Sequence, residues 1–130
     1  MRVVKLERYV VDEIVLRNSM KLPQAKLQLK NRFRYQVKYP KGDDKRCVGE
    51  LALEIGDADA DTPLYLTVRL RGIFLVEAPD KRRVHVESFY QLFPYARSIL
   101  TNTCAMSCLP PLMFPTPDLQ EENIDINFQS

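Results

Sequence analysis

Residues 26–39, with the sequence KLQLKNRFRYQVKY, alternate between apolar and polar side chains more cleanly than any other stretch of the chain. Apart from Asn31, the odd positions are apolar or aromatic: Leu27, Leu29, Phe33, Tyr35, Val37 and Tyr39. The even positions are polar, and five of them are basic: Lys26, Lys30, Arg32, Arg34 and Lys38. Successive side chains of a β-strand point to opposite faces of its sheet. The stretch therefore predicts a strand with one face on a core and one wet, basic face.

Three further stretches predict strands, at residues 3–17, 47–55 and 64–77. Residues 3–17 carry apolar side chains at both odd and even positions, so both faces of that strand are expected to be partly covered. Gly72 interrupts the alternation of residues 64–77 and is expected to mark a bulge or bend. Strands joined by short turns predict an antiparallel sheet.

The second half of the chain changes to helical spacing. Apolar residues recur at that spacing from Phe93 to Cys104, up to about Met106, and the first turn of a helix tolerates Pro94. The basic run at residues 81–83 is expected in a solvated loop before this helix. Residues 110–117 contain four of the nine prolines, which predicts a fixed, extended connector.

A capping box marks the end of the chain. Asp118, followed by Glu121 three residues later, predicts a short last helix over about residues 119–126. The element order therefore predicts an α+β fold, in which a four-stranded antiparallel sheet is backed by a long C-terminal helix and a shorter last helix. Its 130 residues are expected to form a single domain, 1–130.

The composition favours a cytoplasmic globular protein. Apolar residues make up 45% and charged residues 28%, no apolar run approaches the length of a membrane helix, and no signal peptide is expected. Three cysteines without a framework spacing fit a reducing compartment. Residues 1–46 carry a net charge of +8 and residues 47–130 one of −6, which leaves a nucleic-acid partner conceivable. The basic stripe of residues 26–38 has no aromatic side chains on its own face for base stacking, so no nucleic acid is expected.

Catalytic and metal-binding motifs are missing from the sequence. The four glycines are never clustered, which excludes a P-loop, and the single histidine, His85, lies far from a cysteine pair at Cys104 and Cys108. Both cysteines are expected to be inert thiols, and zinc is not expected. Residues 57–61 resemble the start of a calcium loop, but Thr62 and Val68 stand where glycine and glutamate are needed. Neither an enzyme nor a cofactor is therefore expected.

Three segments resemble the SecB family of export chaperones: Arg71-Gly72-Ile73-Phe74, Leu92-Phe93-Pro94-Tyr95-Ala96-Arg97 and Leu109-Pro110-Pro111-Leu112. In that family a strand ends in Gly-Ile-Phe, a long helix opens with Leu-Phe-Pro-Tyr-Ala-Arg, and a proline-containing connector leads to a last helix. The resemblance extends over most of the chain. It implies an ATP-independent holdase that binds unfolded or precursor polypeptides for export, as a homotetramer built as a dimer of dimers.

The resemblance also implies site residues. A peptide-binding groove would be lined by Leu27, Leu29, Leu112, Phe114 and Leu119. Leu66, Val68 and Leu70 match positions at the interface between the dimers, and burial in the core of one subunit is the alternative for each. Binding of extended chains between apolar walls at an open strand edge requires no sequence readout.

One departure from the family concerns the SecA motor. Export SecB offers carboxylates to SecA on its outer sheet face, and the matching positions here hold Glu13, Arg17, Tyr65 and Thr67. With one acid among them, hand-over to SecA is doubtful, because charge complementarity controls partner choice. A SecB-like chaperone dedicated to one partner, such as an antitoxin, is therefore the alternative to export. A basic nucleic-acid-binding module is the less favoured third interpretation.

Overall fold

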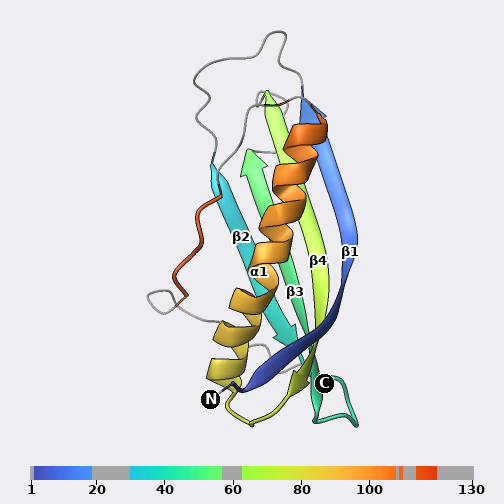
Figure 1. Cartoon of the computed structure of the whole chain (residues 1–130), viewed down its shortest axis with the longest axis vertical. Coiled ribbons are helices and arrows are strands. Elements are labelled where there is room, and N and C mark those ends of the chain that lie inside the picture. The colour runs from blue at the N-terminus through green and yellow to red at the C-terminus, as the bar shows by residue number, and fades with distance from the viewer. Residues whose placement is uncertain (1, 19–29, 57–62, 108, 110–113, 120–130) are drawn as a thin grey trace.

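A computed structural model describes residues 2–18, 30–56, 63–107, 109 and 114–119. In this part of the chain one antiparallel sheet with the strand order β1-β4-β3-β2 is covered on one face by a long helix, as Figure 1 shows. The elements are β1 (Val4–Asn18), β2 (Asn31–Lys38), β3 (Arg46–Gly56), β4 (Leu64–Val76) and α1 (Lys81–Met106). All four predicted strands and the antiparallel sheet are confirmed, except that residues 26–29 of the predicted second strand lie outside the described residues. β1 and β2 form the two edges of the sheet.

Two β-bulges explain why β1 carries apolar residues at both odd and even positions. Its register with β4 shifts between Leu6 and Arg8 and again between Val11 and Glu13. Residues opposite each other in adjacent strands share a face, so Val11, opposite Leu70, lies on the same face as Ile14, opposite Val68. The bulges thus collect apolar side chains of β1 on the face that α1 covers.

Gly72 does not interrupt β4, contrary to the predicted bulge or bend. β4 keeps an unbroken register with β3 from Tyr65 to Leu75, and the bulge opposite lies in β1. A Cβ at Gly72 would lie 2.8 Å from the Phe74 ring and 3.0 Å from the Leu92 side chain. The glycine therefore allows α1 to pack closely on the sheet.

The helix begins more than ten residues before Pro94, so the predicted start and the predicted loop at residues 81–83 are both wrong. Asp80 is the N-cap, and its side chain accepts a hydrogen bond from the Arg83 backbone at 3.2 Å. Buried residues Val84, Phe89 and Leu92 extend the apolar face of α1 toward its N-terminus. Pro94 costs the helix one backbone hydrogen bond, and the close packing of both halves of α1 on the sheet keeps the helix continuous.

The core fills the space between α1 and the sheet. Its largest fully buried side chains include Phe74 from β4 and Phe89 and Phe93 from α1. The rings of Phe89 and Phe93 stack at 5.3 Å, and Phe33 of β2 meets Phe89 at 5.4 Å. One aromatic row thus ties the helix to the edge strand β2.

The described residues contain the single helix α1, and the shorter last helix is not supported. Residues 114–118 are irregular, Leu119 lies in a turn, and the rest of the predicted range lies outside the described residues. Within the described part of the chain, no helix has the length and apolar character needed to cross a membrane.

Candidate functional site

Residues 114–119, called the strap below, lie against α1 on the side of β2, where Figure 1 draws them as a red-orange trace. The Phe114 ring packs 5.9 Å from the ring of Phe93, and Phe114 is 5% exposed. At the other end of the strap Leu119 is 3% exposed. The strap therefore buries an apolar side chain at each end.

Tyr90 holds the main chain of the strap. Its hydroxyl donates to the Pro117 carbonyl at 3.0 Å and accepts from the Leu119 N–H at 3.0 Å. Beside this clamp, Arg97 Nη1 donates to Thr116 Oγ1 at 3.1 Å. One hydroxyl thus satisfies a carbonyl and an amide two residues apart.

The next helical residue, Gln91, does the same for β1. Its Oε1 accepts from the Leu6 N–H at 2.9 Å, and its Nε2 donates to the Val4 carbonyl at 2.9 Å. These two groups of β1 face away from β4, where a neighbouring strand would bind them. Gln91 therefore replaces a neighbouring strand over this part of the sheet edge, and α1 has two adjacent side chains that bind extended main chain.

The predicted groove residues fall into two sets. Phe114 and Leu119 are both brought to α1, on either side of the Tyr90 clamp. Leu27, Leu29 and Leu112 lie outside the described residues. Sequence reasoning missed Tyr90 and Gln91, because a polar side chain that binds backbone leaves no periodic pattern.

The three residues assigned to an interface between dimers are part of the core. Leu66, Val68 and Leu70 are each at most 1% exposed and belong to the hydrophobic cluster beneath α1. This is the alternative that the sequence left open for each of them. In this conformation their side chains have almost no surface for a second copy, and the interface role stays a prediction.

Exposed apolar side chains gather instead on the edge strand β1. Tyr9, Val10, Val11 and Ile14 are between 39% and 46% exposed. The Tyr9 ring lies 4.8 Å from that of Tyr95 on α1, which is itself 44% exposed. An edge strand with this much exposed apolar surface is typical of an interaction site.

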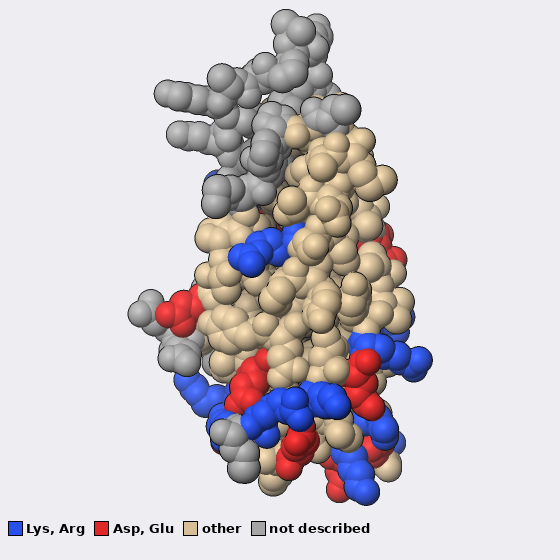
Figure 2. All heavy atoms as spheres, viewed as in Figure 1, with Lys and Arg blue, Asp and Glu red and all other residues tan. Residues whose placement is uncertain are grey.

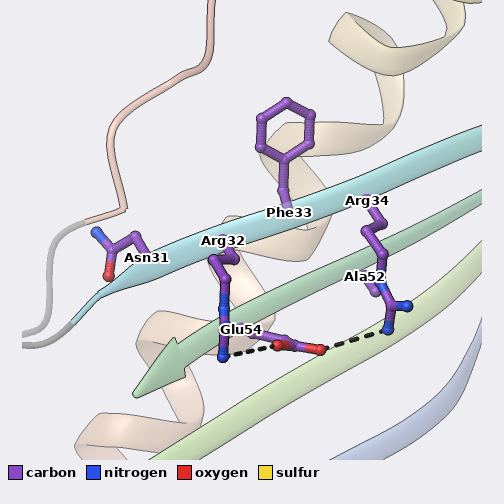
Figure 3. Close-up of a pocket in the computed structure, with 6 residues that line it drawn as sticks. All are labelled: Asn31, Arg32, Phe33, Arg34, Ala52 and Glu54. Carbon is purple, nitrogen blue, oxygen red and sulfur yellow. Dashed lines mark hydrogen bonds and ion pairs between the residues drawn. The ribbon is translucent and has the colours of Figure 1, made fainter. Parts of the chain in front are cut away.

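The sheet face opposite α1 is lined by paired charges. Glu54 of β3 lies 3.5 Å from Arg32 and 3.4 Å from Arg34 of β2, while Phe33 between them points toward α1, as Figure 3 shows. Lys38 pairs with Glu50 at 2.8 Å. Three bases of the predicted stripe are thus paired with two carboxylates within the sheet, which lowers their attraction for phosphate groups.

Three of the four positions matched to the SecA-binding surface are engaged on the same sheet face. The one acid among them, Glu13, lies 3.9 Å from Arg69, and the guanidinium of Arg17 lies 5.3 Å from the centre of the Tyr65 ring.

In the view of Figure 2 charged side chains gather near the end where α1 begins, whereas the surface over the rest of α1 is mostly uncharged.

Three titratable side chains, Tyr35, Cys47 and His85, lie where α1 packs on the sheet, and burial shifts the pKa of each in the direction that favours its neutral form. The Tyr35 hydroxyl lies 2.6 Å from Ser88 Oγ, and burial raises the pKa of Tyr35. Burial also raises the pKa of Cys47 to about 12, so its thiol stays protonated near neutral pH and is a poor nucleophile. Burial lowers the pKa of His85. Among the residues that the structure describes, no three His, Cys, Asp or Glu side chains are grouped to hold a metal ion.

Comparisons with known proteins support the fold. No protein-family model matches the chain. The uncharacterized protein MJ0357 of Methanocaldococcus jannaschii is 28% identical over 119 residues, which are 86% of this chain and 77% of that protein. Among solved structures, the SecB-like chaperone Rv1957 of Mycobacterium tuberculosis, in complex with a ChAD peptide from the Rv1956 HigA1 antitoxin, matches with a TM-score of 0.69. This match has 12% sequence identity and covers 88% of this chain and 91% of that one. The chain therefore has a SecB-like fold.

Proposed function

We propose that this protein is an ATP-independent chaperone that binds unfolded polypeptides. The observation that carries the proposal is the match of its fold, over most of the chain, to a SecB-like chaperone solved with a bound peptide. Unfolded chains expose apolar side chains together with unpaired backbone groups. The flank of α1 beside β2 offers partners for both, because aromatic side chains lie next to a tyrosine that binds main chain.

The proposed binding region comprises the residues assigned from the sequence and the side chains that surround the strap. The assigned residues are Leu27, Leu29, Leu112, Phe114 and Leu119. To these the structure adds Tyr90 and Phe93, which contact Leu119 and Phe114, and Phe33, which joins the same surface through the Phe89 ring. This surface would bind chains of many sequences, because it combines main-chain contacts with generic apolar burial.

The test is suppression of aggregation without nucleotide. A chemically unfolded secretory protein is diluted into buffer with and without this protein, and light scattering is followed over time. We expect suppression at near-stoichiometric amounts, and Leu27→Asp should weaken it because a carboxylate in an apolar site carries a desolvation cost. If a well-folded sample protects neither this client nor others, the general holdase function is wrong.

A chaperone dedicated to one partner, such as an antitoxin, is the second candidate. It is favoured by the open sheet face, where Glu13, the acid retained at the matched positions, is already paired with Arg69. A motor that recognises free carboxylates would find little to bind there. This candidate predicts protection of a single client, and co-purification followed by mass spectrometry would then identify one abundant polypeptide instead of many.

We further propose that the protein forms a homo-oligomer and that the β1 edge contributes to the contact between copies. The exposed apolar side chains of Tyr9, Val10, Val11 and Ile14 support this assignment. Two antiparallel β1 strands from two copies would cover these side chains and continue the sheet. A dimer of dimers remains the proposed assembly, and cytoplasmic localisation is proposed with it.

A further inference from the structure

The strap is bound to α1 in the way that an extended peptide binds to a receptor. In an extended segment the carbonyl of one residue and the N–H of the second residue after it point to the same side. Tyr90 bonds such a pair, the Pro117 carbonyl and the Leu119 N–H, each at 3.0 Å. Every polypeptide carries these groups, so the clamp selects for extended backbone and not for a sequence.

Gln91 shows that this kind of recognition is a property of α1 and not of the strap alone. It bonds the Val4 carbonyl and the Leu6 N–H of β1, again two residues apart, each at 2.9 Å. The two bound segments have unrelated sequences, Pro-Asp-Leu at residues 117–119 and Val-Lys-Leu at residues 4–6. One helix thus binds two different extended segments through the same pair of main-chain groups.

The strap also places side chains as an apolar ligand would. Phe114 extends the aromatic row that starts at Phe89 and Phe93, and Leu119 is buried at the other end. Pro115 and Thr116 between them are exposed. The bound pattern is therefore two buried apolar side chains separated by four largely exposed residues, which segments of many unfolded proteins provide.

We propose that the α1 surface formed by Tyr90, Phe93 and Arg97 is a binding site for an extended polypeptide segment, and that the strap occupies it as an internal ligand. A client then displaces the strap, so within the proposed binding region Phe114 and Leu119 mark the places that client side chains take once the strap has left. This inference rests on the proposed chaperone function and names the ligand class and the regulation of its site.

The occupied state predicts a measurable loss of affinity. When a site is free for only a fraction of the time, the apparent dissociation constant rises by the inverse of that fraction. Weakening the strap should therefore tighten client binding. The variants Phe114→Ala and Leu119→Ala change the strap and leave the α1 surface intact.

The experiment measures the dissociation constant of a fluorescently labelled, reduced and carboxymethylated polypeptide that cannot fold, by anisotropy and without nucleotide. We expect each strap variant of the full chain to bind it about threefold to tenfold more tightly than the unaltered protein. Ser98→Ala, an exposed change on the same helix, is the matched control and should leave the constant unchanged. Circular dichroism confirms that each variant keeps its sheet and helix.

A second arm tests the clamp. Adding Tyr90→Phe to Phe114→Ala removes the hydroxyl and keeps the ring, whose contact with Phe89 at 5.4 Å is thereby retained. If Tyr90 binds client backbone, the double variant should bind the probe several-fold less tightly than Phe114→Ala alone. A purely structural role for the hydroxyl would leave these two constants equal.

The outcomes separate the two proposals. Unchanged or weaker binding by both strap variants overturns the internal-ligand inference, and the chaperone function stands as long as the unaltered protein binds the probe. Equal constants for Phe114→Ala and the double variant overturn the assignment of Tyr90 as the clamp. If no folded variant binds any unfolded polypeptide, the proposed function itself fails.

Discussion

His85 is the single histidine of the chain, and it is only 4% exposed where α1 packs on β2. Its ring meets the Tyr35 ring edge-on at 5.2 Å, and among the described residues its Nδ1 has no hydrogen-bond partner. Burial disfavours the charged imidazolium and lowers the pKa of His85 below its ordinary value of 6.5. Neutral His85 is therefore part of the folded state.

This burial predicts acid sensitivity. Below about pH 6.5 the unfolded chain binds a proton at this residue that the folded chain does not. The free energy of unfolding therefore decreases as the pH is lowered, by at most about 1.4 kcal/mol per pH unit. Above that pH the imidazole is neutral in both states and contributes no pH dependence. Urea unfolding at pH 7.5 and 5.5 should show a larger loss of stability for the unaltered protein than for His85→Met. Equal losses in the two proteins would contradict the prediction.

The strands and the helix differ in how well local sequence patterns predict them. The alternation of residues 26–39 predicted β2 and its basic outer face, and Phe33 and Arg34 do point to opposite sides. Pro94 resembles a helix start in the sequence, so the pattern does not predict the first half of α1. The N-cap of α1 is Asp80. Aspartate is one of the residues preferred at this position, and it comes shortly before the first buried residues of the helix.

Replacing the N-cap should weaken the helix. Asp80→Ala removes the acceptor for the Arg83 N–H and is expected to lower the free energy of unfolding by about 1 kcal/mol. Asp80→Asn keeps an acceptor but loses the negative charge next to three basic residues at the positive end of the helix. Its free energy of unfolding should therefore lie between those of Asp80→Ala and the unaltered protein. Chemical denaturation measures all three proteins, and an alanine variant as stable as the unaltered chain would exclude this cap as a source of stability.

Replacing Gln91 should loosen the start of β1. Gln91→Met keeps the size of the side chain and leaves the Val4 carbonyl and the Leu6 N–H without their partner, at an expected cost of about 1–3 kcal/mol. Gln91→Glu keeps one acceptor and should cost less. Urea unfolding gives the stabilities, and faster hydrogen exchange at the Leu6 amide should localise the effect. Unchanged exchange in Gln91→Met would show that another group covers this edge.

For the whole molecule, the main question is what covers the β1 edge. One sheet and one helix bury the core side of the sheet but leave four apolar residues of β1 between 39% and 46% exposed. The opposite sheet face pairs its own charges across strands, at Arg71 and Asp12 and at Lys38 and Glu50. The molecule therefore offers a second copy an apolar edge and a largely neutralised face.

A charge on that edge should separate the copies. Ile14→Lys introduces an ammonium group that would be desolvated between two β1 strands, so a smaller species is expected with an unchanged circular dichroism spectrum. Light scattering after size exclusion gives the mass, and Arg8→Lys, which keeps the charge of an exposed β1 residue, is the control. An unaltered protein that is already monomeric would remove the oligomer proposal. An Ile14→Lys variant of full mass would place the interface elsewhere.

The sequence by itself determined the strands, the antiparallel sheet and the buried face of the later half of α1, because side-chain periodicity depends on local geometry alone. The resemblance seen in the sequence also singled out Phe114 and Leu119 as site residues, and the structure brings both to one side of α1. Only the tertiary structure decided that Leu66, Val68 and Leu70 lie inside the chain, that bulges align the apolar residues of β1, and that Tyr90 and Gln91 bind main chain. Each of these depends on which backbone lies opposite a side chain, and that is settled when the helix packs on the sheet.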